Sequence, residues 1–286
     1  MKNIKQYCHR LQSAIRSLQI STAKVLRVLV IGGVMHSLPA YAIYQGEPVA
    51  KDELPYVVSI QYIREDNAVI RHSCTGSLIA PRFVLTAAHC LSYKNKLDYK
   101  VLVNASNLAT DVGLPFDIKN IIPYPSYLDD VGGGNGSSDD IMLVELTEPV
   151  ELPLVKLATF PLSHYVNPGG SLTVAGWGVT DDAGTRSTFL KKAQLELLSE
   201  QESLKIWPDI SNNNFGAKGI DGNACKGDSG APVVLMEQEQ LIQVGILSAG
   251  VFQCSRPLTV STRVEPFLEW IEKEQRLSYP RGEMID

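Results

Sequence analysis

The stretch "CTGSLIAPRFVLTAAHC", Cys74–Cys90, carries an apolar run that leads into His89 and is bounded by two cysteines. Short runs rich in Val, Ile and Leu that end at Gly, Pro, Asn or Asp are typical of β-strands. This pattern places His89 at the end of an apolar strand. A single histidine in such a position is more often structural than catalytic, so its role has to be decided from the rest of the chain.

Similar runs recur after residue 42, among them "PYVVSIQYI", "YKVLVNA", "IMLVEL", "SLTVAGWG", "APVVLM" and "LIQVGILSAG". Many short strands at close spacing predict an all-β barrel or sandwich rather than alternating strands and helices. Helical spacing of apolar residues predicts one clear helix, Val264–Gln275. Turn-forming residues predict an exposed loop over Pro125–Asp140. We expect a helical turn followed by a loop over 200–219, and a seam between two halves around 152–164.

Residues 1–42 differ from the rest of the chain, because they contain six Lys and Arg and no acid. An apolar run, Val28–Leu38, is followed by small residues spaced as Ala40-x-Ala42. These features predict a secretory signal peptide over 1–42, followed by one domain over 43–286. The apolar run is too short to span a bilayer comfortably. An uncleaved amphipathic anchor is the alternative.

The composition excludes several classes of function. With 44% hydrophobic and 20% charged residues, the chain has the balance of a soluble globular protein. Without residues 1–42 it holds 20 basic against 31 acidic residues, which disfavours nucleic acid and anionic membranes as partners. We therefore expect no nucleic-acid partner and no stable membrane association. We also expect a monomer without a cofactor.

Cysteine usage is in line with export. Four cysteines follow the predicted leader: Cys74, Cys90, Cys225 and Cys254. An even number in an exported chain predicts two disulfides, and the sequence leaves three pairings open. Metal ligation competes with this interpretation, but no CxxC spacing occurs, so we expect no metal.

Three residues have the chemistry of a nucleophilic hydrolase. Serine is a weak nucleophile that needs a positioned base, and the base needs an orienting group. His89 ends an apolar strand, Asp140 begins another after a loop, and Ser229 lies in the tight turn of "GDSGAP". Each is unremarkable alone, but together they predict a catalytic triad.

These residues also carry a resemblance. The chain resembles the trypsin/chymotrypsin family of serine endopeptidases (peptidase family S1) in "IYQGEPV", "LPYVVSIQ", "CTGSLIAPRFVLTAAHC", "DDIMLVEL", "VAGWG", "CKGDSGAPVV" and "ILSAG". The matches extend over most of Ile43–Gln275. The resemblance implies two six-stranded antiparallel β-barrels, a cleft between them and a C-terminal helix. The order His, Asp, Ser argues against an α/β-hydrolase.

The resemblance also implies residue roles. His89 would take the proton of Ser229, and Asp140, rather than the neighbouring Asp139, would orient the imidazole. The backbone N–H groups of Gly227 and Ser229 would form the oxyanion hole.

Two further implications concern the surroundings of the triad. Ser248 would form a hydrogen bond near the buried aspartate. The implied disulfides, Cys74–Cys90 and Cys225–Cys254, would brace the histidine loop and the specificity pocket.

A new N-terminus at Ile43 would have a function of its own. In the family that the chain resembles, a freshly cut aliphatic N-terminus inserts its ammonium beside the aspartate before the nucleophile, which here is Asp228. The predicted leader ends just before Ile43, so its removal would itself expose the activating amine. A propeptide cut by another protease is the alternative, although no Lys or Arg precedes Ile43.

Asn223 bears on substrate choice. In trypsin-like members an aspartate at this position attracts Lys or Arg, whereas a neutral amide would leave a buried ammonium unpaired. Gly250 would keep the pocket mouth open, and Thr259 (or Leu258) would narrow its floor. We therefore expect cleavage after neutral, small to medium residues.

The resulting hypothesis is a secreted or periplasmic serine endopeptidase that acts on proteins or peptides. Its leader and simplified disulfide set are typical of a bacterial member. The alternative is a binding protein on a protease scaffold with weak or lost activity. A side activity on esters is left open.

Overall fold

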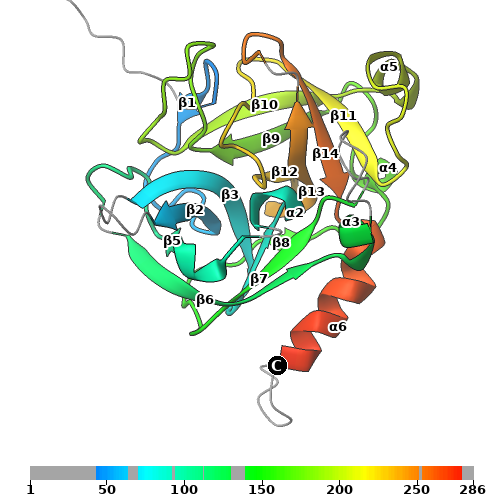
Figure 1. The fold of residues 1–286 in the computed structure, drawn as a ribbon. Helices are drawn as coiled ribbons and strands as arrows, with labels where there is room; N and C mark the ends of the chain where they lie inside the picture. The colour runs from blue at the N-terminus through cyan, green and yellow to red at the C-terminus, as the bar shows by residue number, and fades with distance from the viewer. Residues whose placement is uncertain are drawn as a thin grey trace, which may run out of the picture. The chain divides into compact units, whose positions relative to one another are not determined.

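The first barrel is built from six antiparallel strands in the order β2-β3-β4-β7-β6-β5, closed by pairing of β5 with β2 (Figure 1). The structure is a computed structural model that describes residues 43–63, 70–91, 94–111, 113–129, 139–250 and 253–278. All of them belong to one compact unit of the chain, Ala40–Asp286. The predicted signal peptide lies outside the described residues. The strands are β2 (Val57–Ile63), β3 (Ile70–Ala80), β4 (Phe83–Thr86), β5 (Tyr99–Val103), β6 (Leu114–Pro123) and β7 (Met142–Leu146).

The centre of this barrel sets up the site. Every residue of β4 and of β7 is buried, which explains why both read as continuous apolar runs. The two strands are antiparallel partners, with Thr86 opposite Met142. Because His89 follows the end of β4 and Asp140 precedes the start of β7, this register brings both side chains to the same edge of the barrel.

The second barrel follows the same plan. Its order is β9-β10-β11-β14-β13-β12, and β12 pairs back with β9. Two short strands join its margins: β1 pairs with β10, and β8 runs parallel to β13. The bounds are β1 (Glu47–Pro48), β8 (Lys156–Leu157), β9 (Ser171–Gly176), β10 (Lys191–Leu197), β11 (Asn214–Gly219), β12 (Pro232–Glu237), β13 (Gln240–Gly250) and β14 (Leu258–Arg263). The predicted fold class, two six-stranded β-barrels with a C-terminal helix, is confirmed.

Helices are short except for the last one. They are α2 (Ala88–Leu91), η1 (Lys96–Asp98), α3 (Pro125–Asp129), α4 (Leu162–Tyr165), α5 (Glu200–Ile206), η2 (Glu265–Phe267) and α6 (Leu268–Ser278). Within the described residues, no helix has the length and apolar character needed to span a bilayer.

Two local predictions were wrong. The loop expected over Pro125–Asp140 begins with α3, and residues 130–138 lie outside the described residues. The loop expected within 200–219 contains β11, which pairs with β10 and β14. The sequence of β11, "NFGAKG", has little strand character, so its conformation depends on the two neighbouring strands rather than on local preference.

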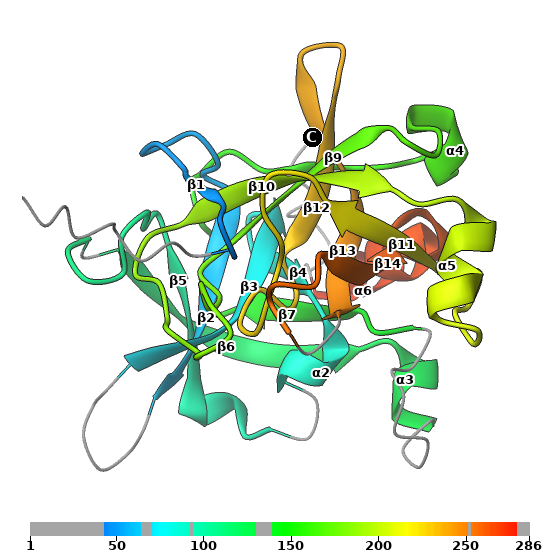
Figure 2. The same cartoon turned by 90° about the horizontal axis from the view of Figure 1, so that it is seen from above.

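The two barrels are joined by polar and apolar contacts. At the interface, buried Ser77 on β3 donates to Oε1 of buried Gln243 on β13 at 2.7 Å. The C-terminal helix leaves the second barrel and packs on the first, where the Tyr124 ring meets those of Phe267 and Trp270 edge-on. Figure 1 shows α6 beside α3, and in the view of Figure 2 the helix lies behind β11 and β14.

Candidate active site

His89 and Asp140 form the centre of the site. His89 lies on α2, directly after the buried strand β4, and 38% of its side chain is exposed. Its Nδ1 lies 2.7 Å from Oδ2 of Asp140, and its backbone N–H donates to Oδ1 at 2.9 Å. The carboxylate is almost fully buried, with 4% of the side chain exposed. The first bond fixes the orientation and the tautomer of the imidazole, because a carboxylate can only accept, and the second holds the carboxylate in place.

The second barrel also holds Asp140. Ser248 on β13 donates to Oδ2 at 2.6 Å, and Thr262 on β14 donates to the backbone carbonyl of Asp140 at 3.3 Å. The aspartate is therefore fixed by residues of both barrels. Partial burial would lower the pKa of His89, but the hydrogen bond to Asp140 and its negative charge outweigh burial and raise that pKa.

The neighbouring carboxylate points elsewhere. Asp139 accepts from Ser126 and, at 2.8 Å, from Nδ2 of Asn213. Of the hydrogen bonds found among the described residues, those of His89 with this adjacent pair go to Asp140 and none to Asp139.

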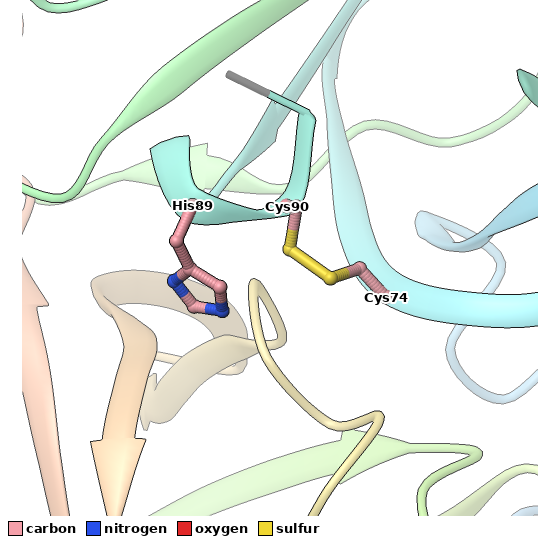
Figure 3. Close-up of side chains that lie close together, drawn as sticks. All are labelled: Cys74, His89 and Cys90. Atoms are coloured by element: carbon pink, nitrogen blue, oxygen red, sulfur yellow. A yellow bond between two sulfur atoms is a disulfide. The ribbon is translucent and has the colours of Figure 1, made fainter. Parts of the chain in front are cut away.

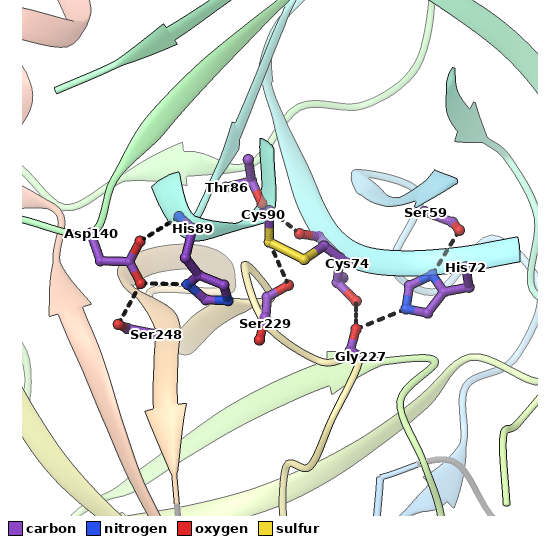
Figure 4. The surroundings of a disulfide bond; sticks show 11 residues. Ser59, His72, Cys74, Thr86, His89, Cys90, Asp140, Gly227, Ser229 and Ser248 are labelled. Atoms are coloured by element: carbon purple, nitrogen blue, oxygen red, sulfur yellow. Dashed lines mark hydrogen bonds and ion pairs between the residues drawn. A yellow bond between two sulfur atoms is a disulfide. The ribbon is translucent and has the colours of Figure 1, made fainter. Parts of the chain in front are cut away.

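Ser229 lies on the other side of the His89 ring. Its carbonyl accepts from the N–H of Thr75 at 2.8 Å and lies 3.7 Å from Sγ of Cys90, the residue after His89 (Figure 4). Among the described residues its hydroxyl forms no hydrogen bond with Nε2 of His89. Such bonds are often long in free enzymes and tighten only with substrate. The turn requires glycine at Gly230, where φ is +82° and a Cβ would lie 2.0 Å from Oγ1 of Thr86.

Gly227 has a backbone conformation that also favours glycine, with φ at +97°. Its carbonyl accepts from Nε2 of His72 at 2.8 Å and from Oγ1 of Thr75 at 3.4 Å. Within the described part of the chain, the N–H groups of Gly227 and Ser229 donate to no protein acceptor. Two backbone donors are therefore available at the turn that carries the serine.

His72 was missed by the sequence analysis. It is 8% exposed, its Nδ1 lies 2.8 Å from Oγ of Ser59, and burial lowers its pKa to about 4. It is therefore neutral at pH 7, with Nε2 as the donor to Gly227 and Nδ1 as the acceptor from Ser59. Its position two residues before Cys74 was the only sequence signal that it lies near the site.

Asp228 is fully buried behind the turn. Its carboxylate accepts from the N–H groups of Gly178 at 2.7 Å and Cys225 at 2.9 Å. Burial raises its pKa to about 7, although these two bonds favour the charged form. Ile43 is also fully buried, in the core of the second barrel, and the next residue, Tyr44, accepts from the N–H of Asn223 at 2.8 Å. In this uncut chain the nitrogen of Ile43 belongs to a peptide bond, so no ion pair with Asp228 is formed.

The residues expected around the specificity pocket lie close together in the second barrel. Thr259 on β14 is opposite Gly250 on β13 and donates to Ala217 at 3.4 Å. Asn223 is 1% exposed and uses Nδ2 to donate to the carbonyls of Arg256 and Cys254, at 2.9 and 3.3 Å. Its Oδ1 is buried without a hydrogen-bond partner among the described residues.

Both implied disulfides are present: Cys74 is bonded to Cys90, and Cys225 to Cys254. Figure 3 shows the first beside the His89 ring. Cys74, His89 and Cys90 are the one group of potential metal ligands that the described residues bring together. Because both sulfurs belong to a disulfide, the group offers no thiolate for a metal.

Comparison with known proteins gives consistent results. A family model described as Trypsin matches residues 43–271. Chymotrypsin-like elastase family member 3B from Macaca mulatta is 32% identical over 255 residues, covering 84% of this chain and 96% of that protein. Melanization protease 1 from Drosophila melanogaster is 30% identical over 81% of this chain and 65% of its own length. Venom serine protease 34 from Apis mellifera is 28% identical over 77% and 55%.

A solved structure is also similar. Neuropsin, a serine protease expressed in the limbic system of mouse brain, covers 82% of this chain and all of its own, with a TM-score of 0.69 and 25% identity. These relatives come from insects and mammals, so they do not support the expected bacterial origin. The chain belongs to the trypsin family, and its similarity to these serine proteases supports its assignment as a serine endopeptidase.

Proposed function

We propose that this chain is a secreted serine endopeptidase that cleaves peptide bonds through His89, Asp140 and Ser229. One observation carries the proposal. His89 Nδ1 is bonded to buried Asp140 at 2.7 Å, which leaves Nε2 on the side of Ser229 (Figure 4). A nucleophile, a base and a group that orients the base are the parts that acyl transfer needs.

In the proposed reaction, Nε2 of His89 takes the proton of the Ser229 hydroxyl as its oxygen attacks the substrate carbonyl carbon. Asp140 stabilises the imidazolium that results. The imidazolium then gives its proton to the leaving amine, and an acyl-enzyme remains. Water, activated by the same histidine, releases the acid and restores the serine.

The oxyanion formed at each step needs donors. We assign this role to the N–H groups of Gly227 and Ser229, each typically worth ~10²–10³ in rate. The hydrogen bond from His72 to the carbonyl of Gly227 supports the assignment, because it fixes the glycine in the positive-φ conformation.

The proposed activation step involves the buried carboxylate of Asp228. Among the described residues Asp228 forms no ion pair, and burial raises its pKa to about 7. We propose that removal of residues 1–42 frees the amine of Ile43, and that this ammonium enters beside Asp228. The backbone bond between Tyr44 and Asn223 supports this proposal, because it already holds the start of the domain near that turn.

Substrate choice depends on Asn223. Both bonds of its Nδ2 go to backbone carbonyls, so the amide presents a buried oxygen without a partner. That oxygen would accept a hydrogen bond from a neutral donor, but it lacks the charge that a buried ammonium requires. We propose cleavage after neutral, small to medium residues rather than after Lys or Arg.

Location and assembly belong to the same proposal. Proteases of this family act on proteins or peptides, and one relative is named as a venom protease. We propose export of this chain through its leader, followed by action as a monomer without stable membrane attachment.

Labelling by a peptidyl phosphonate that reacts with catalytic serines tests the proposal. The chain that begins at Ile43 should be labelled once, Ser229→Ala should not be labelled, and the control Ser163→Ala, at an exposed serine on α4, should react like the parent. A correctly folded, correctly processed chain that resists the reagent would instead be a protease-fold binding protein.

A further inference from the structure

A cavity of about 530 Å³ opens beside the candidate active site. Its wall includes His72 and Ser73, which directly precede the disulfide-bonded Cys74, and Arg186, from the loop between β9 and β10. His72 donates to the carbonyl of Gly227 at 2.8 Å, and Nη1 of Arg186 donates to the carbonyl of His72 at 3.0 Å. The cavity therefore shares a wall residue with the turn that carries Ser229. In Figure 4, His72 lies beyond the Cys74–Cys90 bond from His89.

The cavity is positively charged. Its lining holds three cations, Arg71, Lys94 and Arg186, and one acid, Asp98. All three cations are exposed, and none forms an ion pair with an acid in the part of the chain that the structure describes. Nδ2 of Asn95 lies 3.5 Å from the Asp98 carboxylate. The chain as a whole carries a net charge of −5, so this surface is opposite in sign to the rest of the protein.

The cavity lies on one particular side of the nucleophile. Asn223 and the Cys225–Cys254 disulfide precede Gly227 and Ser229 on the second-barrel side of the turn. The cavity lies on the other side, against the part of β3 that directly precedes the disulfide-bonded Cys74. Because His72 joins the cavity wall to Gly227, two residues before Ser229, we infer that a peptide with its acyl half toward Asn223 extends its leaving half toward the cavity.

We propose that this cavity binds an acidic side chain in the leaving-group half of the substrate. The inference rests on the proposed function, because it takes Ser229 as the point of cleavage. Arg71 and Arg186 can each bond a carboxylate through two N–H groups, which Lys94 complements as a point charge. A concave surface of one sign also raises the local concentration of ligands with the opposite charge.

The expected effect is moderate, because the charges are exposed. Exposed pairs of this kind change affinity by about twofold each, so three cations together predict a preference of roughly eightfold for Glu over Lys. The preference should fall with salt, because the screening length shrinks from ~10 Å at 0.1 M to ~3 Å at 1 M.

Internally quenched peptides test this. They share one neutral acyl half that the enzyme cleaves and carry Glu, Gln or Lys at the first or second position after the scissile bond. The parent should show kcat/KM in the order Glu, Gln, Lys. In Arg71→Gln/Lys94→Gln the ratio of Glu to Lys should fall to about 2, and Arg186→Gln should add to the loss.

The control variant Lys205→Gln/Lys273→Gln removes two exposed cations from α5 and α6, which do not line the cavity and lie apart from β3 in both Figure 1 and Figure 2. It should keep the parent ratio. Because the readout is a ratio within one variant, a general loss of activity does not imitate the effect.

The outcomes separate this inference from the proposed function. A p-nitroanilide with the same acyl half has no residue after the scissile bond, so it reports catalysis alone. If it is hydrolysed while Glu and Lys peptides react equally, the acidic preference is wrong and the protease assignment stands. If neither substrate type is cleaved and no phosphonate label is taken up, the proposed function itself is wrong.

Discussion

Asp139 and Asp140 are adjacent acids that differ in their partners. Asp140 is bonded to His89 and Ser248, whereas Asp139 is bonded to Ser126 and Asn213. Their chemistry is the same, so the direction of each side chain from the backbone separates them. Asp140, two residues before the buried strand β7, points to the barrel edge where His89 lies, whereas Asp139 is bonded to Asn213 instead.

The pH profile tests this distinction. The proposed base is neutral His89, so kcat/KM on an uncharged ester should fall as the pH drops through its raised pKa, above the ordinary value of 6.5. Asp140→Asn removes both causes of the rise, so the acid limb should move to lower pH. Turnover should also drop by about 10⁴.

Asp139→Asn is the matched control, because it changes the neighbouring carboxylate in the same way. It should leave the midpoint of the acid limb in place. If the midpoint shifted equally in both variants, the acid limb of the kcat/KM profile would not reflect the titration of His89 paired with Asp140.

At the scale of elements, α6 connects the two barrels through its contacts. It begins right after the second barrel and ends against β7 of the first, where Ser278 donates to buried Glu145. The same carboxylate accepts from Lys119 at 2.6 Å and from Asn120 at 2.5 Å. Burial would raise the pKa of Glu145, but these three hydrogen bonds together lower it.

Loss of this carboxylate should loosen the helix end. Glu145→Ala should lower the free energy of unfolding by about 2 kcal/mol, since three donors lose their acceptor. The control Glu148→Ala, at an exposed site, should change it by less than about 0.5 kcal/mol. Denaturant titration of both variants measures the difference.

The pH dependence of the Glu145 effect has a definite sign. A lowered carboxyl pKa contributes stability above the ordinary value of 4.5, and this contribution is lost as the pH falls through the folded-state pKa. The gap between the parent and Glu145→Ala should therefore narrow in acid. A gap that is constant down to pH 3 would show that packing, not the charge, is responsible.

At the scale of the whole molecule, cleavage before Ile43 is expected to change the electrostatics of a buried site. In the uncut chain Asp228 has its pKa raised to about 7, so the folded state holds a proton that the unfolded state loses near 3.8. Stability should therefore decrease as the pH rises from about 4 through 7. The new ammonium of Ile43, placed beside the Asp228 carboxylate, would favour its charged form and so remove this loss of stability.

Two chains test this, one that begins at Ile43 and one that carries a single extra alanine. The first should be active and keep its stability up to pH 8. The second should have activity reduced by about 100-fold or more, because its amine cannot enter the site. Active-site titration and thermal unfolding measure both effects. Equal activity of the two chains would contradict the proposed activation.

A control separates the ion pair from the length of the chain. Asp228→Asn should flatten the pH dependence of stability in the uncut chain, because it removes the titrating group. The same substitution in the chain that begins at Ile43 should abolish activity.

The sequence by itself determined the all-β class and the choice of His89, Asp140 and Ser229 as candidates, and the two-barrel architecture followed from the family resemblance. Strand-length apolar runs depend on local composition, and a reactive residue in a tight turn leaves a local signature. Both disulfides, Cys74–Cys90 beside His89 and Cys225–Cys254 near Asn223, also followed from the family resemblance that these motifs carry. What lies along the chain within a few residues could be predicted.

Only the tertiary structure decided what depends on distant contacts. The strand β11 forms because β10 and β14 flank it, and the bond from His72 to Gly227 joins residues 155 positions apart. Distant contacts also decide the orientation of the Asn223 amide, which donates to Arg256. They also bring Arg71, Lys94 and Arg186 together around one cavity. A hydrogen bond or a local field depends on distance in space, and the order of residues does not contain that distance until the chain has folded.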